Sequence, residues 1–331
     1  MAADHVIRLA LVGYGRIAPK HLEVFRALGC EFVACCNRSA PGREKATRDG
    51  GIERTYAKID EMLERERPDG VVSCASLDQV FATAQQILPF AVPTLLEKPP
   101  GTSLAEFDEL ESLAARHRTP VMVGLNRRNY TVLRKAVADA GGPEAITAVF
   151  VEWSEDPAHC LRRGLTESQV ERMVFGNSLH GLDLLTQLAG PIAEPLVLGR
   201  NLGEPFRWLM SLQGISQRGA LATFQSTWDS PGGWRLVFCT PGRRYTFAPL
   251  ETCQVSETGS KELRPIEPDE CDRQFKPGFF GQSLAFLEMI RSGEAPAGQR
   301  LADSRPPMFL AERLTQTCLR TVTQPGGSLK C

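Results

Sequence analysis

The 331-residue sequence has no hydrophobic run long enough to cross a membrane and no excess of charge of either sign. A membrane-spanning helix needs about 20 consecutive apolar residues, and no stretch approaches that length. The 38 Lys and Arg residues balance 39 Asp and Glu residues, which leaves a formal net charge of −1. This balance gives no support for a nucleic-acid or membrane partner. Met1–Ala10 also lack the apolar core and cleavage site of a signal peptide, so we expect a cytoplasmic protein.

Cysteines with the spacing of a zinc or disulfide-exchange site are also missing. The ten cysteines include no C-x-x-C pair, and no Cys and His residues cluster at metal-ligand spacing. In a cytosolic protein of this size we expect reduced and mostly buried thiols. Cys35 and Cys36 are adjacent in an expected strand and should therefore face opposite sides of the sheet. The sequence predicts no metal site.

Strand and helix signals alternate over roughly the first third of the chain. The segments that begin at Ser76 and Ser103 each have the S-x-x-Q/E form of a helix capping box. The expected strands are 6–12, 31–36, 70–74, 93–96 and 121–124, and the expected helices are 19–28, 43–49, 59–66, 78–88 and 104–117. This alternation predicts a parallel sheet with helices on its faces.

The pattern changes after about residue 125. The expected elements are a helix at 132–138, a turn at 141–143, a strand at 146–153, a helix at 167–189, strands at 206–212, 220–228, 234–239, 244–247 and 252–256, and helices at 279–291 and 304–323. The helix at 167–189 should break near Gly176. Consecutive strands with short turns predict a largely antiparallel sheet in a second, α+β part of the chain.

A glycine-rich loop follows the first expected strand. Residues 13–18 read G-Y-G-R-I-A, and the G-x-G-x-x-G/A pattern is informative because it lies between a strand and a helix. Gly13 permits a tight turn, Gly15 lets the backbone approach a pyrophosphate, and the small Ala18 allows close packing of helix on strand. Backbone amides and the helix dipole can then bind the phosphates. The loop predicts a Rossmann dinucleotide site, with an ordinary glycine-rich turn as the alternative.

The residues after the second expected strand bear on the choice of cofactor. NAD enzymes usually place Asp or Glu about twenty residues past the glycines, where the carboxylate binds the ribose hydroxyls. This chain has Asn37, Arg38 and Ser39 there, with Arg43 nearby. Arg38 offers a planar guanidinium that suits a 2′-phosphate. We therefore expect a preference for NADP(H), with NAD(H) possible. The alternative is that Arg38 is a solvated loop residue and the enzyme is indifferent to the phosphate.

Three further segments carry a family resemblance. Glu97-Lys98-Pro99 ends an expected strand, residues 124–130 (GLNRRNY) form a connecting segment, and residues 177–185 (NSLHGLDLL) contain H-x-x-D on an expected helix. Pro99 can fix the backbone through a cis bond. Together with the glycine loop, these segments resemble the glucose-fructose oxidoreductase/inositol dehydrogenase/MocA family, and the matches cover nearly the whole chain.

The resemblance implies both an architecture and a chemistry. We expect an α/β fold with an NADP-binding Rossmann domain at 1–125, followed at 126–331 by an α+β domain for substrate binding and oligomerisation, with an open, mostly antiparallel sheet. Family members mostly oxidise or reduce a carbon of a sugar, cyclitol or nucleotide-linked sugar. By resemblance, Lys98 is the acid/base or substrate-orienting cation, and His180 is the second acid/base candidate. A lysine near a cationic nicotinamide should have a lowered pKa, and histidine titrates in the useful range.

The predicted contacts divide between cofactor and substrate. For the cofactor they are Gly13, Gly15, Arg16, Ile17, Asn37, Arg38, Ser39, Cys74, Ser76, Glu97, Lys98 and Asn126. For the substrate they are Lys98, Arg128, Asn177, His180 and Lys276. Three of these could instead have no role in binding or catalysis. Lys98 would then be a surface lysine, His180 a core histidine and Lys276 a solvated loop lysine. Asp183 shares a helix face with His180 and should orient a group, and His21 is interpreted as structural.

One position departs from the family pattern. Many members have an Asp four residues before the histidine, and this chain has Gly176 there, followed by Asn177. Asparagine can donate and accept hydrogen bonds but cannot serve as a carboxylate base. Either Lys98 and His180 then carry more of the chemistry, or the reaction differs from that of the sugar dehydrogenases.

The sequence thus predicts an NADP(H)-dependent oxidoreductase acting on a sugar, nucleotide sugar or cyclitol, with biosynthetic reduction of a keto-sugar favoured. One alternative is a non-redox lyase or hydrolase with a tightly bound dinucleotide, in which transient oxidation permits elimination or hydrolysis. Another is a non-enzymatic regulator that binds a dinucleotide. The resemblance also implies a homodimer or homotetramer formed through the sheet of the second domain.

Overall fold

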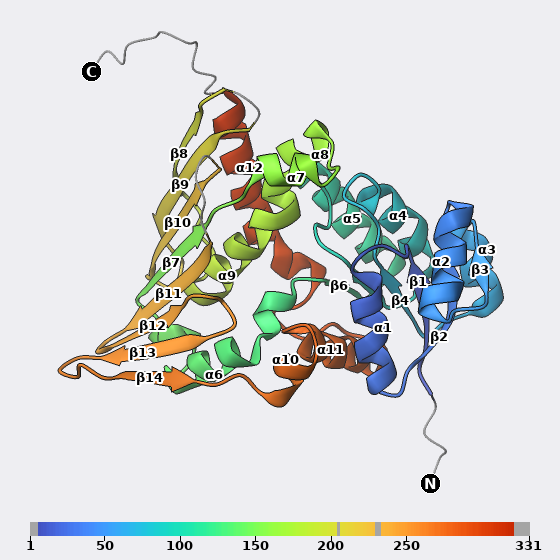
Figure 1. Ribbon diagram of the computed structural model, residues 1–331, viewed down its shortest axis with the longest axis horizontal. Helices are drawn as coiled ribbons and strands as arrows, with labels where there is room; N and C mark the ends of the chain where they lie inside the picture. The colour runs from blue at the N-terminus through green and yellow to red at the C-terminus, as the bar shows by residue number, and fades with distance from the viewer. Residues whose placement is uncertain (1–5, 204–205, 229–232, 321–331) are drawn as a thin grey trace. The chain divides into compact units, whose positions relative to one another are not determined.

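The computed structural model describes residues 6–203, 206–228 and 233–320, which form two compact units. The first unit joins the residues before Tyr130 to Glu270–Arg305, and the second joins Tyr130–Asp269 to the residues after Arg305. The boundary expected after residue 125 lies near the first crossing. Residues 270–305, which we expected in the second domain, group with the first unit. Figure 1 labels the elements of both units.

A six-stranded parallel sheet forms the centre of the first unit (Figure 1). Its strand order, β3-β2-β1-β4-β5-β6, is that of a Rossmann domain. The strands are β1 (Arg8–Val12), β2 (Glu31–Cys36), β3 (Thr55–Tyr56), β4 (Gly70–Ser73), β5 (Thr94–Leu96) and β6 (Val121–Val123). The sequence did not predict β3, because two residues are too few to show a hydrophobic period. The predicted parallel α/β architecture is confirmed.

Helices cover both faces of this sheet. They are α1 (Ala18–Ala27), α2 (Ala40–Gly50), α3 (Ile59–Glu66), α4 (Val80–Ile87), α5 (Leu104–His117), α10 (Glu270–Gln274) and α11 (Phe279–Ser292). Alternate residues of β1 enter different cores, as the two-residue period of a strand requires. Leu9 lies in a core with Phe25 of α1 and Phe286 of α11, whereas Ala10 lies in a core with Met62 of α3.

The two predicted capping boxes differ in outcome. Ser103 caps α5, because its Oγ accepts a hydrogen bond from the Glu106 N–H at 3.1 Å. The Glu106 carboxylate reaches back to the N–H of Thr102, one residue before the cap, at 2.6 Å. The box predicted at Ser76 is wrong. That residue lies in a turn, and α4 begins at Val80 after Gln79, with no side-chain cap.

The cysteines follow the predicted arrangement where the structure describes them. Cys35 lies in the core with Leu9, and Cys36 lies in the core on the opposite face. The described cysteines are free thiols and most are buried, while Cys331 lies outside the described residues. None of the described helices is long and apolar enough to cross a membrane.

The second unit contains an eight-stranded sheet in the order β14-β13-β12-β11-β7-β10-β9-β8. Its strands are β7 (Ala148–Trp153), β8 (Leu196–Asn201), β9 (Trp208–Ile215), β10 (Leu221–Thr227), β11 (Trp234–Thr240), β12 (Arg243–Phe247), β13 (Cys253–Glu257) and β14 (Leu263–Ile266). Among the strands of this sheet that the structure describes, only β7 and β10 pair in parallel, which confirms a mostly antiparallel sheet. The sequence missed β8 and β14, which are the two edge strands and have weak patterns; β14 contains Pro265, which an edge strand tolerates.

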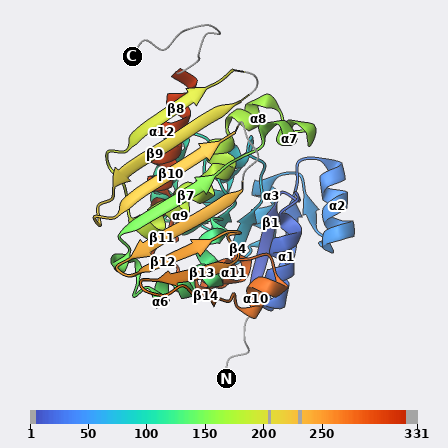
Figure 2. The same cartoon turned by 60° about the vertical axis from the view of Figure 1, so that its left-hand side comes forward.

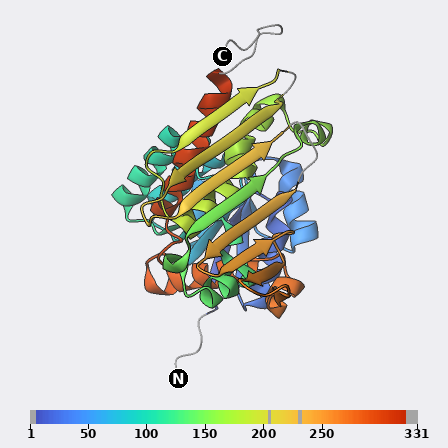
Figure 3. The ribbon, with the colours of Figure 1, turned by 90° about the vertical axis from the view of Figure 1, so that its left-hand side faces the viewer.

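One face of this sheet is covered by helices of the same unit. The helices of this unit are α6 (Thr131–Asp139), α7 (Pro157–Arg162), α8 (Glu167–Glu171), α9 (Leu179–Ala189) and α12 (Arg305–Arg320), of which α6, α9 and α12 contact the sheet. Helix α9 packs on β7 and β10, and Gly199 of β8 approaches Cys318 of α12. Figures 2 and 3 show the strands side by side, and no described helix of this unit covers the face turned to the viewer in Figure 3. Residues 321–323, predicted at the end of the last helix, lie outside the described residues.

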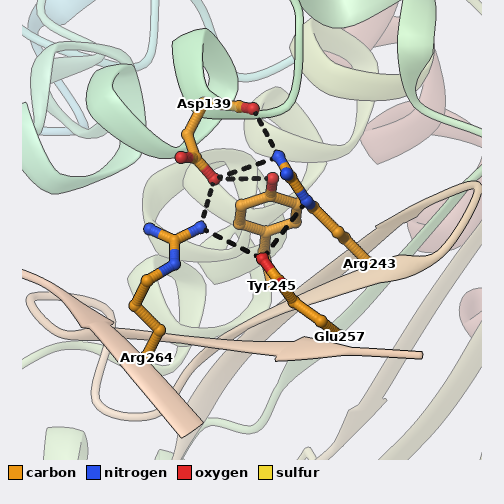
Figure 4. A network of polar contacts seen from close by, with 5 residues as sticks. All are labelled: Asp139, Arg243, Tyr245, Glu257 and Arg264. Carbon is orange, nitrogen blue, oxygen red and sulfur yellow. Dashed lines mark hydrogen bonds and ion pairs between the residues drawn. The ribbon is translucent and has the colours of Figure 1, made fainter. Parts of the chain in front are cut away.

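A polar network ties α6 to the β12–β14 end of the sheet (Figure 4). The Asp139 carboxylate accepts hydrogen bonds from the Tyr245 hydroxyl and from Arg264 Nη2, both at 2.8 Å. Arg243 donates to the Asp139 carbonyl oxygen at 3.0 Å, and Glu257 Oε1 lies 3.3 Å from Arg243 Nε. The Arg264 guanidinium, then the Tyr245 hydroxyl and Arg243, hold the pKa of Asp139 below its ordinary value against an opposing effect of partial burial.

Candidate functional site

The glycine loop lies at the carboxyl end of β1. Gly13 has φ of +86°, and a Cβ built there would lie 2.9 Å from the carbonyl oxygen of Cys74. The Gly13 N–H donates to the carbonyl of Cys36 at 2.9 Å. A Cβ on Gly15 would meet no atom closer than 4.0 Å, and the fully buried Ala18 begins α1. The loop therefore has the tight turn, open backbone and close helix packing that suit a pyrophosphate at a helix N-terminus.

The loop after β2 has no carboxylate and carries an exposed arginine. Arg43 Nη1 donates to the carbonyl oxygens of Asn37 and Arg38, both at 2.9 Å, and this fixes the loop backbone. Ser39 caps α2 by accepting a hydrogen bond from the N–H of Gly42 at 3.2 Å. The side chain of Arg38 is exposed. A guanidinium beside a helix N-terminus can bind a phosphate.

The other predicted cofactor contacts in this region differ in exposure. Arg16 is exposed, and Ile17 is partly buried against the core. Cys74 follows β4 with its side chain in the hydrophobic core, where burial raises the pKa of the thiol well above its usual range. Only the backbone carbonyl of Cys74 lines the turn at Gly13. Ser76 lies two residues further on, exposed.

Glu97 and Lys98 follow directly on β5. Glu97 is 8% exposed, and its Oε1 lies 2.8 Å from Nε2 of His21, a completely buried residue of α1. A Cβ on Gly124 would lie 3.1 Å from the Glu97 carboxyl carbon, so the glycine leaves room for the carboxylate. Lys98 is half-buried, and its peptide bond to Pro99 is cis. The end of β5 thus combines a buried carboxylate with an adjacent amine.

Two predicted contacts hold loops within the first unit. Asn126 is buried, and its Nδ2 donates to the carbonyl oxygen of Pro277 at 2.9 Å. Arg128 donates to the carbonyl oxygen of Gly298, and its Nη2 donates to that of Asp303 at 3.3 Å. These bonds give both side chains a structural role. Their roles toward cofactor and substrate stay predictions.

Lys276 lies in the loop that Asn126 holds in front of α11. Its Nζ lies 5.2 Å from the centre of the Phe279 ring. Partial burial, followed by the charge of Arg127, lowers the pKa of Lys276. The charge of Glu97 opposes this effect and Lys20 adds to it. The loop therefore presents an amine in positive surroundings, close enough to Glu97 to feel its charge.

In the second unit, Asn177 contacts a carboxylate that the sequence analysis did not single out. Asn177 lies in a π-helical turn (Val174–Ser178), and its Nδ2 lies 2.8 Å from both carboxylate oxygens of Glu155. Glu155 is 8% exposed and also accepts a hydrogen bond from Trp153 Nε1 at 3.0 Å. The break expected near Gly176 is therefore confirmed as this turn, a feature common at functional sites.

His180 is the second residue of α9 and is buried. Asp183, one turn later, is also buried. A Cβ on the next residue, Gly181, would lie 2.7 Å from the ring of Trp153, so the glycine lets α9 approach β7 closely. His180 follows Asn177 by three residues, which places the two on neighbouring positions of the helical surface. The second unit thus places an imidazole three residues after the amide that binds the buried Glu155 carboxylate.

Sequence reasoning missed two of these groups. His21 was interpreted as structural, and its bond to Glu97 joins elements 76 residues apart in sequence, a pairing that no local pattern contains. Glu155 follows the end of a strand without any motif. The one available signal was its position two residues after the aromatic end of β7. Among the described residues, no three Cys, His, Asp or Glu side chains group as a metal site.

Comparison with known proteins agrees with this geometry. The profile of a family described as "Oxidoreductase family, NAD-binding Rossmann fold" matches residues 7–125. The rhizopine catabolism protein MocA of Rhizobium meliloti is 26% identical over 97% of this chain and 98% of its own length. Myo-inositol dehydrogenase Hyg17 of Streptomyces leeuwenhoekii is 27% identical over 60% of each chain.

A solved structure of levoglucosan dehydrogenase in complex with NADH has the same fold. It superposes with a TM-score of 0.81 at 12% identity and covers 96% of this chain and 98% of that one. The matched Rossmann residues, the MocA protein that spans both units and the shared fold agree with the resemblance in the motifs. Residues 7–125 thus match the glucose-fructose oxidoreductase/inositol dehydrogenase/MocA family of oxidoreductases, and the chain is similar to the MocA protein over nearly its whole length.

Proposed function

We propose that this chain is an NADP(H)-dependent oxidoreductase that transfers a hydride to or from a carbon of a sugar, nucleotide sugar or cyclitol. The observation that carries the proposal is the turn at Gly13, where a side chain would collide with the Cys74 carbonyl. This turn fits a dinucleotide pyrophosphate, and Lys98 follows a strand of the same sheet. Relatives named for rhizopine catabolism and for myo-inositol and D-apiose dehydrogenation support a polyhydroxylated substrate.

The preference for NADP(H) over NAD(H) rests on the loop after β2. Arg38 is exposed beside the N-terminus of α2, and Arg43 is committed to the loop carbonyls. The segment Asn37–Ser39 contains no carboxylate to repel a 2′-phosphate. Arg38 and the Ser39 region would therefore bind that phosphate. The glycine loop, Arg16 and Ile17 would lie along the pyrophosphate.

Lys98 and His180 would move the hydroxyl proton. A bound nicotinamide supplies the hydride chemistry, while the protein takes up or returns the proton of the hydroxyl at the carbon that reacts. Lys98 carries the acid/base role and His180 is the second proton carrier. Asn177, Arg128 and Lys276 would orient the polar groups of the substrate.

Glu155 supplies the carboxylate that position 176 lacks. It is buried and bound to Asn177, one helical turn before His180. A carboxylate in this position can accept a hydrogen bond from a substrate hydroxyl or stabilise a protonated imidazole. The absence of Asp at Gly176 is therefore compatible with proton transfer through His180.

We also propose a biosynthetic direction, the reduction of a keto-sugar, because cellular NADPH is usually kept reduced. The first unit would bind the cofactor, and the second would bind substrate and associate with a second copy through the uncovered sheet face. The protein would act in the cytoplasm as a homodimer or homotetramer.

A screen of NADPH consumption over keto-sugars and inosose-like ketones tests the activity. Turnover of one such ketone, with oxidation of one NADPH for each product alcohol, is the expected result. Fluorescence titration tests the cofactor preference, and equal binding of NADPH and NADH would overturn it. Retained dinucleotide without net redox change would indicate an elimination or hydrolysis instead.

A further inference from the structure

Lys276 is a solvent-exposed lysine in the loop before α11. Its Nζ lies 5.2 Å from the centre of the Phe279 ring, within the range of a cation–π contact. Within the part of the chain that the structure describes, this amine forms no hydrogen bond or ion pair. The three donors of the ammonium are therefore available to a ligand.

The loop that carries Lys276 is held in place on both sides. Asn126 Nδ2 donates to the carbonyl oxygen of Pro277 at 2.9 Å. The Gly278 N–H donates to Oδ1 of the buried Asp272 at 2.7 Å. Because these two bonds fix the backbone next to Lys276, the amine is presented from a defined position in the first unit.

Two further cations lie near this amine. Arg127 directly follows the asparagine that holds the loop, and Lys20 directly precedes His21, whose ring lies 4.8 Å from the ring of Phe279. Helix α11 contacts both α1 and the turn after β6, and the charges of Arg127 and Lys20 both act on Lys276. Three segments that are distant in sequence thus bring three cations close together.

The neighbouring carboxylates compensate for this positive charge only in part. The pKa of Lys276 is lowered, first by partial burial and then by the charge of Arg127, and the carboxylate that opposes this effect is Glu97, which is bound to an imidazole at 2.8 Å. Lys20 pairs with Glu23 at 3.1 Å in an exposed contact, which contributes little. A lowered lysine pKa means that the surroundings disfavour the ammonium form. An anionic ligand would therefore stabilise the charged amine.

We infer that Lys276 and Arg127 bind an anionic group of the substrate, a carboxylate or a phosphate, so that the substrate is an acidic or phosphorylated sugar or cyclitol. This inference rests on the proposed function. A guanidinium offers a planar pair of donors to two oxygens, whereas an ammonium binds as a point charge. Glu97 acts on Lys276 and directly precedes Lys98, which favours the substrate over the cofactor phosphates as the source of the anion. A neutral hydroxyl would supply hydrogen bonds but no counter-charge.

Kinetics on matched substrates test the inference in the wild-type protein. The ketone screen would offer each ring in three forms, which are the neutral sugar, its carboxylate and its phosphate ester. We expect kcat/KM to be about 10- to 100-fold higher for one anionic form than for the neutral form, the usual effect of charge-assisted hydrogen bonds. The two anionic arms identify which group is bound. Equal or faster turnover of the neutral form would overturn the inference, and absence of turnover for every form would refute the proposed function with it.

Substitution of Lys276 tests the role of the charge. Lys276→Met removes the charge and keeps an apolar side chain against the Phe279 ring. We expect KM for the anionic substrate to rise about 10- to 100-fold with little change in kcat, because the lost binding is common to ground state and transition state. Lys276→Arg keeps the charge and should retain much of the affinity. Lys135→Met is the matched control, since that lysine pairs with Asp269.

Cofactor binding is the second measurement on the same variant. Fluorescence titration should give Lys276→Met the NADPH dissociation constant of the wild type. Weaker NADPH binding would assign the cations to a cofactor phosphate and overturn the inference, as would an unchanged KM or an equal loss for neutral and anionic substrates. If Lys276→Met does not fold, Arg127→Lys, which keeps the charge but loses the planar donor pair, should raise the same KM and leave turnover of the neutral form unchanged. Any of these failures in a protein that still oxidises NADPH would refute the inference alone.

Discussion

Two carboxylates in this protein hold distant elements together, yet they differ in their exposure to solvent. Asp139 has a side chain that is 30% exposed, and it lies against Tyr245, Arg264 and Arg243 (Figure 4). Glu97 is buried and bonds to one imidazole. The network around Asp139 pairs two guanidiniums with the carboxylates of Asp139 and Glu257. The Glu97 contact is almost completely shielded from solvent.

This difference separates a stabilising contact from one available for function. A carboxylate already paired with two guanidiniums gains little from a further cation. Loss of that carboxylate should therefore change mainly the free energy of unfolding. A buried carboxylate costs free energy of desolvation, which its hydrogen-bond partners must offset. We expect variants around Glu97 to change ligand binding and turnover, and variants around Asp139 to change stability.

The largest effect in this comparison is expected from substitution of Lys98, which is next to Glu97. Lys98→Ala should reduce kcat/KM by about 10²- to 10⁴-fold, the usual range for loss of an acid/base group, with little change in the midpoint of thermal unfolding. Steady-state kinetics on the substrate found by the ketone screen provide the measurement. Lys135→Ala is the control, since that lysine pairs with Asp269 at the surface of the second unit. Full turnover by the Lys98 variant would remove it from the mechanism.

Arg38 offers a second test in the first unit. Arg38→Ala should weaken NADPH binding by about 10- to 100-fold and leave NADH binding nearly unchanged, because the lost charge-assisted hydrogen bonds reach only the 2′-phosphate. Fluorescence titration of both reduced cofactors measures the effect. Arg48→Ala is the control, because Arg48 pairs with Asp49 on α2. Loss of affinity for both cofactors alike would contradict the assigned role.

Asp139 should show the opposite behaviour. Asp139→Asn should lower the free energy of unfolding by about 1–2 kcal/mol, since it loses partly exposed, charge-assisted hydrogen bonds. Turnover of the folded variant should equal that of the wild type. Denaturant unfolding and kinetics on the same preparation give both quantities. A large loss of turnover at unchanged stability would erase the distinction between the two regions.

The smallest expected effect is the pH dependence of the same contact. Because the pKa of Asp139 is lowered in the folded protein, the unfolded chain binds the proton more readily. The carboxylate therefore contributes fully above the ordinary Asp pKa of about 3.9, and its contribution is lost as the pH falls through the lower folded value. The stability difference between the wild type and Asp139→Asn should shrink over that range. A difference that grows toward low pH would contradict the network.

Much of the fold could be predicted because its central strands have strong local patterns. β2 and α3 were predicted with the boundaries they have, and the opposite orientation of Cys35 and Cys36 follows from the period of a strand. The edge strands β8 and β14 and the short helices α7 and α10 were missed. Edge strands need less hydrophobic sequence because less of their surface is buried, and helices of fewer than two turns show no period.

The candidate site was predictable only where a motif fixes the backbone. Gly13 is required by a backbone conformation and a close carbonyl, and both are encoded by the local sequence. The partners of Glu97 and Asn177 are set by tertiary contacts with His21 and Glu155. Two residues that lie far apart in sequence carry no local mark of their pairing. The capping box at Ser76 was wrong for a related reason, since the backbone there formed a turn and left the side chains no helix end to cap.

The chain leaves the first unit after Asn129 and returns to it at Glu270. Helix α11, from this returning segment, contributes Phe286 to the core beneath β1. A protein cut after residue 125 would retain every strand of the Rossmann sheet and expose the apolar surface that α11 covers. Residues 1–125 alone therefore lack part of the hydrophobic core of the first unit. The α11 segment that completes the first unit is synthesised only after the sheet of the second unit. An exchange of second units between relatives would therefore have to keep an α11 segment that matches the retained first half.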